Sequence, residues 1–231
     1  MNALKTPAAK AMIAFVVVSV ALVVALWPRG DGPTAPVSTT GAAASSTQGI
    51  SDEPVTTEMM SKARADAALP PCPTGTGPAA PGAVLAGVQA QCLADGATID
   101  VGAATAGRPT VINLWAVWCQ PCRRELPLFD RLYAQAGDQL NVLGVHAYDG
   151  ARKEYAILTF LAEVGVHLPV IADVDGTVAK ALGAPRVFPS TILVRADGTV
   201  AEILPTVFDS YEELTGVVRD ELGVDLNGVG R

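Results

Sequence analysis

The chain contains few of the residues that several functional classes require. Only four of its 231 residues are cysteine and two are histidine, and the 16 lysines and arginines are outnumbered by 23 aspartates and glutamates. The net charge of −7 argues against nucleic-acid binding, which needs a basic surface. One C-x-x-C pair is present without a second C-x-x-C or C-x-x-H, which leaves too few ligands for tetrahedral zinc. We therefore expect no nucleic-acid partner, no metal and no cofactor.

The C-x-x-C pair, Cys119 and Cys122, lies where a strand is expected to meet a helix. The apolar run 110–117 predicts a buried strand, and residues 123–133 suit a helix. Free amide groups and the helix dipole in the first turn stabilise an anion, so a thiolate at Cys119 would be favoured there. A structural disulfide is the alternative interpretation, but this position favours a redox-active couple.

An uncharged apolar run, residues 11–27, lies near the N-terminus. Its length is at the short end of the roughly 17–25 residues that cross a membrane as a helix. Lys5 and Lys10 precede the run, and Trp27 ends it. The positive-inside bias therefore predicts a cytoplasmic segment 1–10, a single-pass transmembrane anchor 11–27 and an extracytoplasmic remainder. The alternative is a cleavable signal peptide, whose apolar core is usually shorter, about 7–15 residues.

Composition predicts a linker and one domain beyond the anchor. Residues 28–57 are rich in Pro, Gly, Ala, Ser and Thr and offer few large apolar groups to offset the entropy of ordering, so they predict a flexible linker. Residues 58–83 are expected to form a short helix, stopped by Pro70, and a loop extension. A domain over 84–222 and a frayed tail over 223–231 complete the predicted organisation.

The hydrophobic pattern of the domain predicts alternating strands and helices. Strand–helix–strand–helix order implies parallel strands joined by a right-handed crossover, and Asp-Gly turns predict two hairpins. Pro127 falls inside the helix after the C-x-x-C pair and should kink that helix rather than end it. The strands predicted in the chain cover residues 88–93, 97–101, 110–116, 140–146, 169–172, 190–194 and 199–204. The predicted helices cover residues 57–69, 123–137, 153–164, 177–182 and 210–222.

Cys72 and Cys92 form the second pair of cysteines. Their spacing fits no zinc or redox motif, whereas an extracytoplasmic compartment permits a disulfide. A bridge would close a loop of about 21 residues and restrict the unfolded chain, by roughly 3 kcal/mol in the chain-entropy treatment. We expect a structural disulfide that ties the first helix to the first hairpin, with a second catalytic couple as the alternative.

Two segments resemble the TlpA/ResA branch of the thioredoxin-like superfamily, over roughly 84–222. They are 113–127 (NLWAVWCQPCRRELP) and 187–191 (VFPST). The resemblance implies an α/β, thioredoxin-like fold, a central mixed sheet flanked by helices, with an N-terminal transmembrane helix and a flexible linker. The branch consists of membrane-anchored thiol–disulfide oxidoreductases. It therefore also implies a single-pass protein of the bacterial cell membrane whose catalytic domain is extracytoplasmic.

The resemblance assigns roles to residues around the motif. Pro189 matches the family's cis-proline, which lies against the disulfide and whose neighbouring backbone pairs with the substrate chain. The alternative is a proline that begins an edge strand. A family glutamate matches Glu125, three residues after Cys122 on the helix and so able to relay its proton. The alternative for Glu125 is a solvated residue of the first turn. Asn113 agrees with this branch, because cytosolic thioredoxins carry a buried Asp at that place.

Three residues of the motif region are expected to shape its properties. Trp118 precedes the thiols and would form part of the substrate surface, Pro121 restrains the pair, and Gln120 is the position that families vary to tune the potential. His146 and His167 lack a surrounding motif, and we assign neither a role. The predicted catalytic residues are Cys119, Cys122 and Glu125, and the predicted substrate-binding residues are Trp118, Gln120, Pro121, Phe188 and Pro189.

The expected reaction is reduction of protein disulfides. Cys119 attacks a substrate disulfide, and Cys122 resolves the mixed disulfide. The resemblance implies protein thiol or disulfide substrates, such as the haem-binding cysteines of apocytochrome c or copper-site assembly factors, and a transmembrane electron donor as partner. A disulfide-forming oxidase is the first alternative. A thioredoxin-fold metallochaperone, which would use C-x-x-x-C, and a peroxiredoxin, whose Pro-x-x-x-Thr-x-x-Cys pattern is absent, are the others.

Overall fold

The described part of the chain begins after the predicted anchor. The computed structural model describes residues 54–147, 150–151 and 153–226. The cytoplasmic segment predicted over 1–10, the anchor predicted over 11–27 and most of the predicted linker lie outside these residues. Within the described ranges, no helix is both long enough and apolar enough to cross a membrane.

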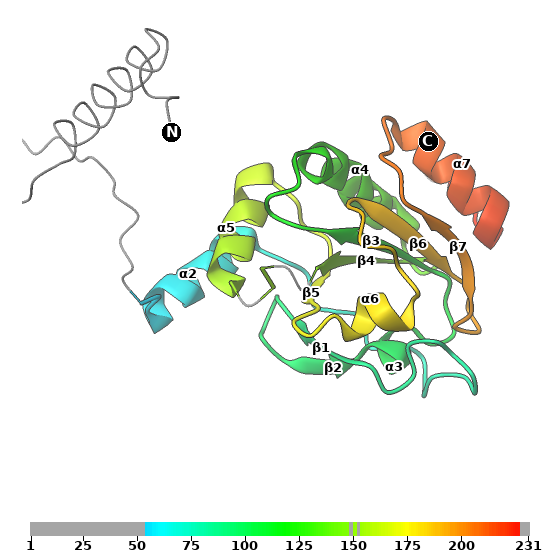
Figure 1. Ribbon diagram of the computed structural model, residues 1–231, viewed down its shortest axis with the longest axis horizontal. Coiled ribbons are helices and arrows are strands. Elements are labelled where there is room, and N and C mark those ends of the chain that lie inside the picture. The colour runs from blue at the N-terminus through cyan, green and yellow to red at the C-terminus, as the bar shows by residue number, and fades with distance from the viewer. Residues whose placement is uncertain (1–53, 148–149, 152, 227–231) are drawn as a thin grey trace, which may run out of the picture. The chain divides into compact units, whose positions relative to one another are not determined.

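Seven strands form one mixed sheet in the order β2-β1-β5-β4-β3-β6-β7 (Figure 1). β3 pairs with β4 and β4 with β5 in parallel, and the other neighbours are antiparallel. The predicted parallel pair and both predicted hairpins, β1–β2 and β6–β7, are confirmed. The strands are β1 (Gln89–Cys92), β2 (Thr98–Asp100), β3 (Thr110–Trp115), β4 (Asn141–His146), β5 (Val170–Ala172), β6 (Ser190–Val194) and β7 (Val200–Leu204).

The helices predicted between residues 57 and 222 are all present, with their ends shifted by a few residues at most. The long helix α4 continues through Pro127, as predicted, and ends at Gly137, whose positive φ of 51° suits a residue without a side chain. The helices are α2 (Thr57–Ala67), α3 (Val101–Thr105), α4 (Gln120–Ala136), α5 (Glu154–Val164), α6 (Thr177–Ala181) and α7 (Tyr211–Leu222).

The short helix α3 was not predicted. Its five residues, VGAAT, are too few and too small to show a helical period in the sequence. The Asp100 side chain caps it by accepting a hydrogen bond from the Ala103 amide at 2.9 Å. A Cβ on Gly102 would lie 2.5 Å from the Leu85 carbonyl oxygen, so the backbone of Leu85 packs directly against this helix.

Helices cover both faces of the sheet, and the central strand β3 is consequently buried along its whole length. Figure 1 shows α4 and α7 on one face and α3 and α6 on the other. Val111 and Trp115 point into the apolar cluster formed with α4, α5 and α7. Ile112 and Leu114 point into the cluster on the opposite face. Because each buried side chain of this size contributes roughly 1.5–3 kcal/mol, β3 is a rigid support for the residues that follow it.

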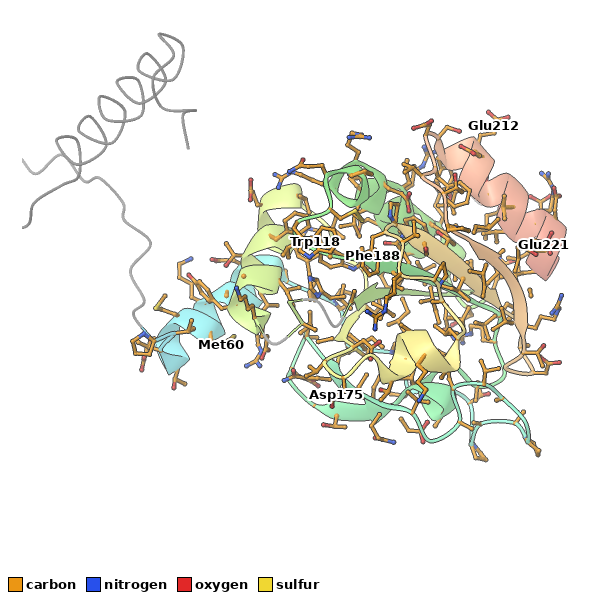
Figure 2. The ribbon with its side chains drawn as sticks, in the orientation of Figure 1. Met60, Trp118, Asp175, Phe188, Glu212 and Glu221 are labelled. Carbon is orange, nitrogen blue, oxygen red and sulfur yellow. A yellow bond between two sulfur atoms is a disulfide. The ribbon has the colours of Figure 1, made fainter. Side chains whose placement is uncertain are left out.

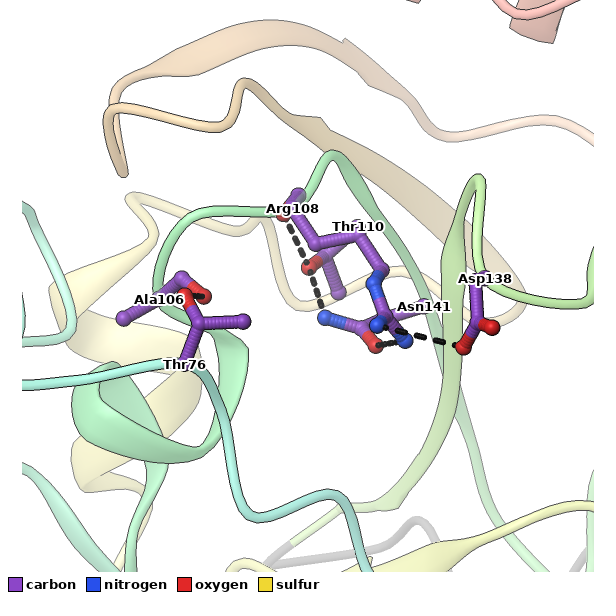
Figure 3. A network of polar contacts seen from close by, with 6 residues as sticks. All are labelled: Thr76, Ala106, Arg108, Thr110, Asp138 and Asn141. Atoms are coloured by element: carbon purple, nitrogen blue, oxygen red, sulfur yellow. Dashed lines mark hydrogen bonds and ion pairs between the residues drawn. The ribbon is translucent and has the colours of Figure 1, made fainter.

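A polar network fixes the other end of β3, where β3 and β4 begin (Figure 3). Arg108 donates to Asn141 Oδ1 at 3.4 Å and contacts Asp138 at the same distance. Asn141 in turn donates to Thr110 Oγ1 at 3.3 Å. These contacts link the starts of the two parallel strands, at the end of the sheet that is remote from the C-x-x-C motif.

The segment before the sheet is joined to it by a disulfide between Cys72 and Cys92. Cys92 ends β1, and Cys72 follows the helix α2. An ion pair of 2.6 Å between Arg64 and Glu154 also holds α2 on α5. The two cysteines therefore pair as expected, and the structural role of their bridge stays a prediction.

Candidate active site

The C-x-x-C pair occupies the junction of β3 and α4. The chain turns after Trp115, and the Cys119 amide donates to the Ala116 carbonyl at 3.0 Å, which closes the turn. Cys119 is the N-cap of α4, and its Sγ accepts a hydrogen bond from the Cys122 amide at 3.2 Å. Pro121 lies in the first turn of α4, where its missing amide hydrogen costs no helical hydrogen bond. Cys119 and Cys122 are joined in a disulfide.

The disulfide is nearly covered, with one aromatic side chain exposed beside it. Cys119 is 4% exposed and Cys122 1%, whereas Trp118 is 57% exposed. Both cysteines are therefore buried in the oxidised protein, and the role of Cys119 as the attacking thiol stays a prediction. Gln120, the first residue of α4, is also exposed.

Phe188 and Pro189 come from a distant part of the chain, directly before β6, and Phe188 contacts the motif region. Phe188 packs edge to face against Trp118, with ring centroids 5.6 Å apart, and Figure 2 shows the two labelled side chains side by side. The peptide bond between Phe188 and Pro189 is cis. Pro189 is buried, and it precedes a strand that lies between β3 and β7, so the alternative of a proline beginning an edge strand is wrong.

Glu125 lies one turn after Cys122 and is fully buried. Asn113 of β3 donates to its Oε1 at 2.8 Å, and the Phe208 amide donates to its Oε2 at 3.0 Å. Burial raises the pKa of Glu125 to about 7; the two hydrogen bonds act in the opposite direction. The alternative of a solvated first-turn glutamate is therefore wrong. A carboxyl group with a pKa near 7 can accept and release a proton at neutral pH, as a general base must.

The structure reveals one residue at the site to which the sequence assigned no role, His146. It is the last residue of β4, it is buried, and its Nε2 accepts a hydrogen bond from the Val117 amide at 3.2 Å. The available signal was positional, because His146 ends a strand parallel to the one that enters the motif. His167, by contrast, contacts the Ala67 carbonyl at the end of α2.

A pocket of about 350 Å³ opens beside Phe188. Phe188 lines this pocket and also contacts Trp118. Apolar groups of β3 and α6 form much of the wall, and Lys180 contributes a cation. The lining includes Leu114, Ala147, Ala179, Lys180, Ala184 and Phe188.

The second disulfide lies in a different environment. Cys72 and Cys92 belong to the apolar cluster on the face of α3 and α6, whereas Cys119 and Cys122 belong to the cluster on the face of α4. The structure thus does not bring the two pairs together. Among the described residues, no group of three or more His, Cys, Asp or Glu side chains is arranged to hold a metal ion.

A disulfide at the N-terminus of a helix that follows a central strand, together with a cis-proline directly before the neighbouring strand, is typical of the thioredoxin-like class. The mixed sheet with helices on both faces confirms the predicted thioredoxin-like α/β fold. The chain belongs to the AhpC/TSA family, which it matches over residues 78–203.

Named relatives agree with the resemblance to the TlpA/ResA branch. The chain is 27% identical to the thioredoxin-like protein YneN of Bacillus subtilis over 97 residues, which is 42% of this chain and 56% of YneN. It is 29% identical to the thiol–disulfide oxidoreductase ResA of Halalkalibacterium halodurans over 98 residues, 42% of this chain and 53% of that ResA. The chain thus spans about half the length of these curated relatives. Among solved structures, MTB DsbF is similar at 28% identity, with a TM-score of 0.52, over 60% of this chain and 96% of DsbF.

Proposed function

We propose that this protein is a thiol–disulfide oxidoreductase that reduces protein disulfides through Cys119 and Cys122. The observation that carries the proposal is the hydrogen bond from the Cys122 amide to Cys119 Sγ at the N-terminus of α4. In the reduced protein the same amide and the helix dipole would stabilise a Cys119 thiolate, the nucleophile of disulfide exchange. The ResA relatives, named thiol–disulfide oxidoreductases, support this activity.

The proposed reaction transfers two electrons from the dithiol to the substrate. The Cys119 thiolate attacks a substrate disulfide, forms a mixed disulfide and releases one substrate thiolate. Cys122, deprotonated, then attacks the Cys119 sulfur, releases the second substrate thiolate and closes the Cys119–Cys122 disulfide. We assign the Cys122 proton to Glu125, because this carboxyl group lies one helical turn away and its pKa of about 7 suits proton transfer at neutral pH.

The proposed substrate is an extended segment of a protein. Trp118 and Phe188 provide an aromatic surface next to the C-x-x-C motif, and we assign contact with the substrate backbone to the cis residue Pro189. We assign Gln120 and Pro121, in the first turn of α4, to the same proposed contact surface. Aromatic side chains give large contact areas with polypeptides, which supports a protein rather than a small-molecule substrate.

The proposed location is outside the cytoplasm, with the N-terminal run as a membrane anchor and a membrane protein as electron donor. Cytochrome c maturation or metal-site assembly would then be the process served. The Cys72–Cys92 disulfide supports this location, since structural disulfides persist in oxidising compartments. A membrane-impermeant maleimide should label Cys119 in intact cells that express the full chain after mild reduction. Labelling that requires cell lysis would contradict the proposed location.

Trapping the reaction intermediate tests the activity and identifies the partner. Cys122→Ala removes the resolving thiol, so we expect a mixed disulfide between Cys119 and the substrate to accumulate. Mass spectrometry of the trapped complex names the substrate. The double variant Cys119→Ala/Cys122→Ala is the control and should trap nothing. A Cys122→Ala protein that is folded and captures no partner would overturn the proposal.

The direction of electron flow is tested by the reduction potential of the Cys119/Cys122 couple, measured against glutathione. Thioredoxin has a potential of about −270 mV, and a strong disulfide-forming oxidase has about −120 mV. We expect a value closer to that of thioredoxin. A value closer to that of the oxidase would contradict the reductase assignment and favour the alternative function of the same site, disulfide formation.

A further inference from the structure

His146 lies against the loop that carries the nucleophile. β3 and β4 are parallel, and their last residues, Trp115 and His146, are register partners. The loop that leaves β3 toward Cys119 therefore starts beside the His146 side chain. The imidazole is fully buried and packs edge to face on Trp115, with ring centroids 4.8 Å apart. The backbone of His146 is also held, because its carbonyl accepts the Asp173 amide at 3.0 Å.

The imidazole completes the hydrogen bonding of the turn that delivers Cys119. That turn spans 116–119, and Val117 is its second residue. The amide at this position of a β-turn has no partner within the turn. Here the Val117 amide, in a half-buried part of the loop, donates to His146 Nε2 at 3.2 Å, which gives this donor a partner.

The second ring nitrogen fixes the form of the imidazole. Nε2 can accept only when it carries no proton, so in the neutral ring the proton is on Nδ1. Nδ1 lies 3.0 Å from the Ala147 carbonyl oxygen, to which it donates. Both nitrogens are thus used, each toward a backbone group at the site. Burial lowers the pKa of His146 to about 4, so the ring stays neutral at neutral pH.

We propose that His146 is a positioning residue of the redox site: its neutral imidazole holds the Val117 amide and thereby fixes the turn that presents Cys119 at the N-cap of α4. The inference rests on the proposed function of Cys119. In the oxidised protein the disulfide itself restrains Cys119. In the reduced protein that covalent restraint is gone, and the 116–119 turn together with the first turn of α4 places Cys119 Sγ against the Cys122 amide. His146 therefore acts mainly on the reduced form.

Two substitutions separate the two hydrogen bonds of the ring. The amide of an asparagine side chain reaches the place of Nδ1 but not that of Nε2, so His146→Asn keeps the Ala147 contact and loses Val117. A glutamine side chain is one methylene longer, so the carbonyl oxygen of His146→Gln can accept the Val117 amide. The second variant is therefore the conservative rescue of the first.

The readout is the rate at which iodoacetamide alkylates Cys119 in the full chain carrying Cys122→Ala, with the Cys72–Cys92 disulfide intact. We expect His146→Asn to slow alkylation about fivefold or more at pH 7, and His146→Gln to restore it to within about twofold. Urea unfolding shows whether each variant is folded. A folded His146→Asn protein that reacts at the parent rate, or a His146→Gln protein as slow as His146→Asn, would overturn the inference.

A measurement on the unsubstituted protein keeps the inference testable if these variants do not fold. ¹⁵N NMR of the His146 ring at pH 7 should show a neutral imidazole protonated at Nδ1, with its Nε2 in a hydrogen bond to the Val117 amide. A ring protonated at Nε2, or a charged ring, would contradict it. Neither the spectrum nor the alkylation rate depends on a substrate, so they distinguish failure of this inference from failure of the proposed reductase activity.

Discussion

Glu125 combines a position inside the core with hydrogen bonds to both carboxyl oxygens. The two donors, the Asn113 side chain and the Phe208 amide, come from β3 and from the segment before α7. They keep the carboxyl group in place, one helical turn after Cys122, while burial opposes its ionisation. At neutral pH the Glu125 carboxyl group is therefore close to its pKa and can gain or lose a proton.

The raised pKa of Glu125 makes stability depend on pH. Burial moves this pKa from 4.5 to about 7, so the stability contribution is full below pH 4.5 and is lost as the pH rises through 7. Glu125→Gln cannot ionise. We therefore expect its free energy of unfolding, relative to the wild type, to rise by roughly 2–3 kcal/mol between pH 4.5 and pH 8. Urea unfolding of the oxidised proteins checks this, and a constant difference over that range would contradict it.

Substitution of the single residue Trp118 tests the proposed substrate surface. Its ring is largely exposed, so Trp118→Ala should change the free energy of unfolding by less than about 1 kcal/mol. Loss of the edge-to-face contact with Phe188 removes an aromatic surface that would contact the substrate chain. We expect KM for a protein disulfide to rise several-fold with kcat nearly unchanged, in steady-state assays. Trp118→Phe is the matched variant and should retain most of the affinity; equal effects of both would count against an aromatic contact.

At the scale of elements, two glycines in helices have opposite surroundings. A Cβ on Gly102 of α3 would lie 2.5 Å from Leu85 O, whereas a Cβ on Gly216 of α7 would meet only the Arg219 side chain, at 3.9 Å. Gly102→Ala should therefore lower the free energy of unfolding by roughly 1–3 kcal/mol. Gly216→Ala should raise it by about 0.5–1 kcal/mol, because alanine favours the helix. Denaturant unfolding of the two variants measures both changes. A Gly102→Ala variant as stable as the wild type would show that α3 is not held against Leu85.

At the scale of the whole molecule, the Cys72–Cys92 disulfide connects the segment after α2 to the sheet across 20 residues of sequence. Replacing both cysteines, Cys72→Ser/Cys92→Ser, should lower the free energy of unfolding by roughly 3 kcal/mol, because the unfolded chain gains freedom. Disulfide reduction by Cys119 and Cys122 should be unchanged, since the two pairs lie in clusters on opposite faces of the sheet. Loss of that activity in a folded variant would favour the second catalytic couple.

The arrangement of the whole domain also explains which predictions from sequence were sound. Strands such as β3 were predictable because burial on both faces demands an unbroken apolar run, which few loops contain. Helix ends were predictable where a capping residue or glycine stands, as at Ser210 and Gly223 for α7. The helix α3 was missed because its stability comes from close packing on Leu85 rather than from its own five residues.

The sequence by itself determined the C-x-x-C pair, the strand and helix on either side of it and, through the resemblance of the surrounding segments, the thioredoxin-like fold. These features depend on neighbours in the chain, whose spacing can be counted. Only the tertiary structure decided that Glu125 is buried between Asn113 and Phe208, and that His146 holds the Val117 amide. Those contacts join residues far apart in sequence. The free energy of each contact depends on how well the folded sheet and helices exclude water from it. The spacing of residues along the chain does not reveal this exclusion of water.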